Sequence, residues 1–85
     1  MANPAWKTAE DIAEGYVTLN PVVLKKLEKH ELDQLVQELA KVLRDVRVQV
    51  VPPDDSEKAQ AKSRKMLRIS QAQVVLQGYR SRMGR

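Results

Sequence analysis

Few side chains in this sequence could carry out covalent or metal chemistry. Cysteine is absent and His30 is the single histidine, which excludes thiol nucleophiles, disulfides and multi-histidine metal sites. No serine or cysteine stands near His30, and it falls at a predicted helix junction, so we expect an exposed residue there. Asp54 and Asp55 could bind a divalent cation, but no third ligand recurs at a usable spacing, and helix capping is expected instead. We therefore predict no enzymatic activity, no catalytic residue, no metal site and no cofactor.

Cationic side chains are the residues whose pattern indicates a function. Residues 1–57 hold 7 Lys and Arg against 11 Asp and Glu, whereas residues 58–85 hold 8 Lys and Arg and no acid. The overall charge of +4 therefore combines a net −4 in the first part with a net +8 in the last. Because Glu is a good helix former and like charges four residues apart on a helix repel, this absence of acids needs an explanation.

A helical hairpin would gather seven of these cations beside its bend, where their own chain supplies few acids. This set, the cationic cluster, consists of Arg44, Arg47, Lys58, Lys62, Arg64, Lys65 and Arg68. One interpretation is that it binds RNA or DNA, with counterion release and a strong dependence on salt. A second is that acidic helices of the same chain or of a partner subunit neutralise it. A third is that the helix is simply solvated, with basic residues near its C-terminus favoured by the helix dipole.

Two long helices are expected to position the cluster. One apolar stripe, with spacings of three and four, runs through Leu32, Leu35, Leu39, Val42 and Val46. It predicts an amphipathic helix over residues 31–48. A second stripe, through Met66, Ile69, Ala72, Leu76 and Tyr79, predicts a helix over residues 56–82. Pro52 and Pro53 cannot continue a helix, and Asp54, Asp55 and Ser56 are natural N-cap residues, so the chain should turn over residues 51–55.

The N-terminal third predicts one or two short helices. Asn20 followed by Pro21 is typical of a helix start, and the apolar residues after it predict a helix over residues 21–29. Thr8 and Asp11 resemble a capping box, which would begin a helix over residues 9–14 that stops at Gly15. Trp6 precedes this helix and is expected to close one end of the core.

The last helix carries a second apolar line besides its main stripe. Leu67 and Val74 are seven residues apart, and Val75 lies between the two lines. A helix that is apolar on two sides usually has neighbours on two sides, so this line is the candidate packing or dimer face. Two hairpins would then associate into a four-helix arrangement. The alternative is that the short N-terminal helices cover this side within one chain.

These observations predict an all-α protein with a single domain over residues 1–85. It divides into an N-terminal segment (1–19), a helical arm (20–50), a Pro-Pro-Asp-Asp turn (51–55) and a basic helical arm (56–85). No apolar run is long enough to span a membrane, the N-terminus does not resemble a signal peptide, and a cytoplasmic location is expected. The predicted function is a protein–protein interaction or adaptor module that pairs with itself or another protein and has no evident small-molecule substrate. The alternative is a nucleic-acid-binding regulator that uses the basic face of the last helix.

Overall fold

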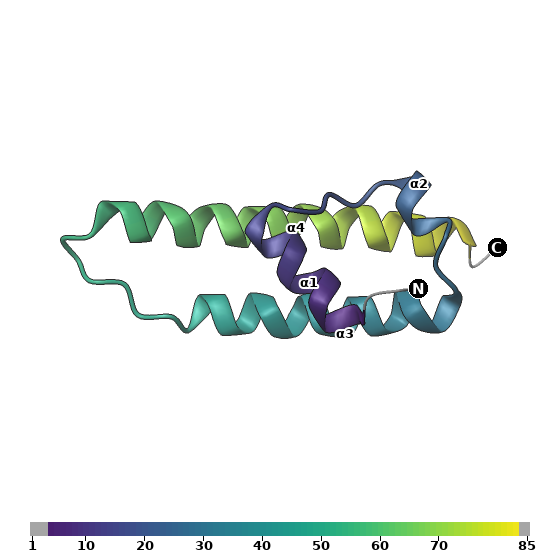
Figure 1. Cartoon of the computed structure of the whole chain (residues 1–85), viewed down its shortest axis with the longest axis horizontal. Coiled ribbons are helices and arrows are strands. Elements are labelled where there is room, and N and C mark those ends of the chain that lie inside the picture. The colour runs from purple at the N-terminus through teal and green to yellow at the C-terminus, as the bar shows by residue number, and fades with distance from the viewer. Residues whose placement is uncertain (1–3, 84–85) are drawn as a thin grey trace.

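The computed structural model describes residues 4–83, which contain four helices and no strand. The helices are α1 (Ala5–Glu14), α2 (Pro21–Leu24), α3 (Lys29–Arg47) and α4 (Ser56–Met83). α3 and α4 lie side by side as a hairpin, and α1 crosses both of them (Figure 1). The predicted all-α hairpin of two long helices is confirmed, with α3 beginning two residues earlier than expected and α4 at the expected start.

The bend of the hairpin is built by local interactions that the sequence predicted. The two prolines lie in the segment between α3 and α4, where no helix continues. Asp55 precedes the first residue of α4, and its carboxylate accepts a hydrogen bond from the backbone N–H of Lys58 at 3.0 Å. This bond satisfies one of the N–H groups that a helix start leaves without an intrahelical partner. Asp55 is therefore a capping residue, as the sequence predicted.

The core lies where α1, α3 and α4 meet. Its fully buried large side chains are Leu24, Leu32, Leu35, Leu39, Ile69 and Leu76. Leu39 comes from the middle of α3 and Ile69 from the middle of α4, so the two predicted stripes face each other. Ala9, Ile12 and Ala13 add the buried face of α1. The small side chains of Ala9 and Ala13 let this helix approach the hairpin closely.

The beginning of α1 differs from the sequence prediction. The helix starts at Ala5 rather than at residue 9, after Pro4 in an extended conformation. Thr8 is thus an interior residue whose hydroxyl lies 3.4 Å from the Pro4 carbonyl, and the capping-box interpretation is wrong. Trp6 becomes a helical residue at the edge of the buried face and is 52% exposed, so it does not close the core. The end of α1 is as predicted, because Gly15 adopts a positive φ of 87°.

The second short helix begins as predicted but ends early. The side chain of Asn20 accepts a hydrogen bond from the backbone of Val23 at 3.0 Å, and Pro21 occupies the first helical position. The helix ends at Leu24 instead of residue 29, because turns follow and Glu28 already serves as the N-cap of α3. Of the helices described, none has the length and apolarity to cross a membrane. The cytoplasmic location stays a prediction.

Candidate functional site

The cationic cluster lies where the sequence placed it, along the first half of α4 and the last turn of α3, beside the bend. Lys62 is the residue that joins the two helices there. Its ammonium group donates to the backbone carbonyl of Arg47 at 3.0 Å and to that of Gln49 at 2.9 Å. The last carbonyls of a helix lack intrahelical partners and carry partial negative charge. Lys62 therefore caps the C-terminus of α3.

Three other members of the cluster also have partners in their own chain. The Lys65 ammonium lies 3.0 Å from the Glu14 carboxylate, and the Lys58 ammonium lies 3.9 Å from Asp55. Arg68 donates to the backbone carbonyl of Ala13 at 3.1 Å. This bond gives a partner to one of the carbonyls at the C-terminus of α1. Together with Lys62, four of the seven cations thus stabilise helix ends or pair with acids of the chain.

The three remaining members are exposed arginines. Arg44 and Arg47 have no hydrogen-bond or ion-pair partner within residues 4–83, and Arg64 makes one long contact of 3.4 Å to the Gln60 carbonyl of its own helix. An exposed guanidinium can donate two parallel hydrogen bonds to a phosphate or a carboxylate. The part of the cluster that is open to an external anion is therefore smaller than the sequence predicted.

A groove with apolar walls lies between α4 and the segment that follows α1. It has a volume of about 620 Å³. Ile12, Val17 and Leu19 contribute to one wall, and Val74 and Val75 contribute to the other. The segment between Gly15 and Asn20 runs along α4 (Figure 1), which is how residues some 55 positions apart in sequence come to share one groove.

The predicted packing residues lie at this groove and beside it. Val75 is half-buried and packs against the core, whereas Val74 lines the groove with 71% of its surface exposed. Leu67 lies two helical turns before Val74 and is 58% exposed. The short N-terminal helices therefore do not cover Leu67 and Val74, although α1 and the segment after it engage Val75. The alternative, in which the short N-terminal helices cover the second apolar line of α4 within one chain, does not hold for these two residues.

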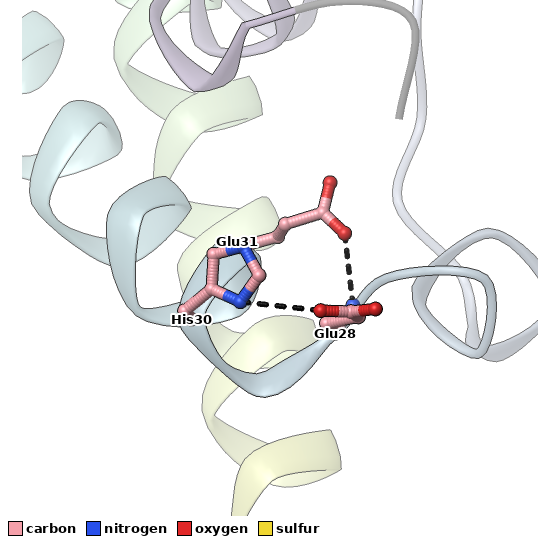
Figure 2. A group of neighbouring side chains, drawn as sticks. All are labelled: Glu28, His30 and Glu31. Atoms are coloured by element: carbon pink, nitrogen blue, oxygen red, sulfur yellow. Dashed lines mark hydrogen bonds and ion pairs between the residues drawn. The ribbon is translucent and has the colours of Figure 1, made fainter.

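One group of side chains in residues 4–83 has the composition of a metal site, and the sequence analysis did not single it out. Glu28, His30 and Glu31 place a ligand atom each within 4.8 Å of one another at the start of α3 (Figure 2). Glu28 and Glu31 have a structural role at this helix start. The Glu31 carboxylate accepts the Glu28 backbone N–H at 3.1 Å, and His30 lies 3.4 Å from the Glu28 carboxylate. The bond from the Glu28 backbone holds the pKa of Glu31 below its ordinary value, and the group is interpreted as a helix cap.

Residues 17–19 form a part of the groove that the sequence did not predict. Val17 and Leu19 lie in a segment without regular structure, so helical periodicity says nothing about them. The available signal was the alternation of apolar residues between Gly15 and Asn20, which is typical of an extended segment with one buried side. Leu19 is the buried residue of that segment.

Comparisons with protein-family models, with curated proteins and with solved structures found no match to this chain. Two surfaces of the described residues are candidates for a functional site. They are the apolar groove beside Val74 and the exposed arginines at the bend.

Proposed function

We propose that this chain is a small non-enzymatic protein–protein interaction module that docks through the apolar groove and the exposed side of α4. The observation that carries the proposal is a groove walled by Ile12, Leu19 and Val74 that stays open while Leu67 projects beside it. Large apolar side chains that are exposed beside a groove are typical of interaction surfaces. The proposal also agrees with the small number of side chains capable of chemistry.

Affinity capture with three forms of the chain tests this function. The wild type, Val74→Glu and Val50→Glu are immobilised and exposed to a cell extract. Val50 is 94% exposed and lies in the bend away from the groove, so it is the matched control. We expect proteins that bind the wild type and the control but not Val74→Glu, and that remain bound in high salt, because apolar contacts are not screened.

A retained protein is then purified and its affinity measured by calorimetry against the same three forms. Binding that falls only with Val74→Glu supports the proposal. Identical retention and identical affinity for all three forms would contradict it, because the groove would then take no part in docking.

The second candidate function is polyanion binding, in which the exposed side chains of Arg44, Arg47 and Arg64 contact phosphates. The observation in its favour is that no acidic residue follows Glu57, so α4 has no carboxylate of its own after its first turn. The proposal is narrower than the full cluster, because Lys62, Lys65 and Arg68 are held by intramolecular partners. Lys58 is 70% exposed and makes only a 3.9 Å contact with Asp55.

Fluorescence anisotropy with a short labelled nucleic-acid duplex and a short labelled single strand tests the second candidate. The affinity should fall steeply between about 50 and 200 mM salt. Replacement of Arg44 and Arg47 by Ala should reduce the slope of log affinity against log salt by about 2. Replacement of the exposed Lys25 and Lys26, which lie far from the bend in sequence, is the control. Absence of binding at low salt would exclude this function.

A further inference from the structure

One strip of exposed positions along α4 carries no charged residue, although exposed charges such as Arg64 and Arg82 lie beside it. Eight positions spaced alternately by four and three residues share one side of the helix, and we call them the uncharged face. They are Ser56, Gln60, Ser63, Leu67, Ser70, Val74, Gln77 and Ser81, and all eight are exposed. The cations of the helix, such as Lys62, Arg64 and Arg68, lie outside these positions. A helix with this many cations would be expected to turn some of them toward solvent along such a face.

The uncharged face is complementary to itself when two copies lie antiparallel. A two-fold axis passing near Ser70 and Gln71 brings Leu67 of each copy against Val74 of the other. The same operation brings Ser63 opposite Gly78. The interface is then isologous, with apolar side chains meeting apolar side chains at two symmetric places.

The distribution of charge favours this orientation over a parallel one. In a parallel pair, the five cations of residues 58–68 would lie along the same five cations of the copy, and like charges that approach are destabilising. The antiparallel pair instead sets them along residues 73–83, which hold two cations. In the antiparallel pair, Arg64 lies near Gln77 and Gly78 of the copy, which carry no charge. No acidic partner is therefore needed for two basic helices to approach.

Gly78 and the groove supply the space that close approach requires. A Cβ added at Gly78 would have no heavy atom within 4 Å, so no contact within the described chain requires a glycine at this helical position. Glycine inside a helix is unfavourable relative to alanine, and a second backbone nearby would explain it. At Val74 the groove is open beside the helix, so a Leu67 side chain from the copy can enter where Val74 and Leu19 form the walls.

We infer that the partner for this face is a second copy of the chain, paired antiparallel through α4 with Leu67 seated in the groove beside Val74. The inference rests on the proposed function, because it names the occupant of the same docking surface. A small chain that buries a limited core also gains most from such association.

Sedimentation equilibrium measures the association. We expect the wild type and the Val50→Glu control to approach twice the chain mass of 9.7 kDa. Val74→Glu and Leu67→Glu should each raise the dimer dissociation constant by more than about tenfold, because an unpaired charge would be buried. Circular dichroism confirms that each variant keeps its helical content. A wild type that remains a monomer up to millimolar concentration overturns the inference.

Single-cysteine cross-linking then measures the orientation, since the chain has no native cysteine. Ser70→Cys lies beside the two-fold axis and should be linked efficiently to its copy by oxidation or a short bismaleimide. Ser63→Cys should not be linked, because antiparallel packing places it some fifteen residues, or about 22 Å, from Ser63 of the copy. Equal linking at both positions would overturn the antiparallel arrangement.

The two levels of the proposal fail in different ways. A monomeric chain whose groove still captures another protein, in a manner lost with Val74→Glu, overturns self-pairing and leaves the interaction function standing. A chain whose mass and captured proteins are both unchanged by Val74→Glu overturns the inference and the proposed function together.

Discussion

At the scale of single residues, Gly15 and Arg68 together hold the end of α1 against α4. Gly15 has a φ of +87°, and a Cβ at this position would lie 3.0 Å from the Arg68 Cζ atom. Arg68 in turn donates to the Ala13 carbonyl. A side chain at position 15 would therefore press on the guanidinium and require it to shift by a few tenths of an ångström.

Substitution of Gly15 by Ala is expected to destabilise the chain. A left-handed backbone costs a residue with a Cβ about 1–2 kcal/mol, and displacement of Arg68 adds the loss of its hydrogen bond. Thermal unfolding measures the change. Gly15→Asn is the informative comparison, because Asn tolerates the left-handed region yet still crowds Arg68. A loss in Gly15→Asn equal to that in Gly15→Ala would show that crowding dominates over backbone strain.

Glu31 should make the stability of the chain depend on pH in the acid range. Its pKa is lowered from the ordinary value of 4.5, first by the hydrogen bond from the Glu28 backbone. A carboxyl group whose pKa is lower in the folded state contributes stability above its unfolded pKa. That contribution is complete above pH 4.5 and is lost as the pH falls through the lower folded value.

Denaturation curves of the wild type and Glu31→Gln between neutral pH and pH 3 check this dependence. Glutamine can keep a hydrogen bond to the Glu28 backbone but does not titrate. The variant should therefore lose less stability on acidification than the wild type does. Parallel stability profiles for the two proteins would contradict the assigned role of Glu31.

At the scale of the elements, the end of α3 depends on a side chain from α4. Lys62 donates to two carbonyls of the chain that leaves α3. Lys62→Met keeps most of the apolar stem and removes the donor, and we expect a loss of about 1 kcal/mol, or a Tm lower by about 4–8 °C.

Lys58→Met is the matched control for this prediction. Lys58 also lies in the first part of α4, but its ammonium makes only a 3.9 Å contact with Asp55, and its side chain is 70% exposed. Such surface pairs contribute little, so the Tm should hardly change. Equal losses in the two variants would mean that Lys62 acts through general charge rather than as a cap.

The two long helices are also linked at the end of the hairpin away from the bend, where the contact is an ion pair between side chains. Arg80 donates to the Asp33 carboxylate and so links the last turns of α4 to the first turns of α3. In an antiparallel hairpin, acids near the start of the first helix are expected to lie beside cations near the end of the second. The Asp33–Arg80 pair confirms this for one pair of residues.

At the scale of the whole molecule, opposite charges are separated along the chain but partly recombined by folding. Lys65 meets Glu14 and Arg80 meets Asp33, so acids of the first two-thirds neutralise cations of the last third. The uncharged face of α4 takes no part in these ion pairs. In consequence the molecule presents exposed arginines at the bend and an uncharged, partly apolar surface along α4.

If the chain pairs through this surface, its thermal stability should depend on its concentration. Association that involves only the folded state raises the Tm as the concentration increases. The Tm of the wild type should therefore rise from micromolar to millimolar chain, whereas that of Val74→Glu should stay constant. Scanning calorimetry measures both. A Tm of the wild type that is independent of concentration would contradict association of the folded chain.

The elements of this protein were determined largely by local sequence. Stripes of apolar residues at helical spacing and the prolines ahead of Asp55 predicted the two long helices and the bend. Asn20 before Pro21 predicted the start of α2, and Gly15 predicted the end of α1. These signals act over a few residues and need no tertiary contact. Local signals also explain the two wrong helix boundaries, because the start of α1 and the end of α2 depend on neighbouring elements as well as on capping residues.

The candidate sites were decided only by the tertiary structure. Whether Lys62 or Lys65 faces solvent depends on carbonyls and carboxylates far away in sequence, because folding brings α1 and the end of α3 against α4. The groove likewise needs Leu19 and Val74, which are 55 residues apart. The sequence determined which side chains are cationic or apolar, and tertiary packing decided which of them remain available to a partner.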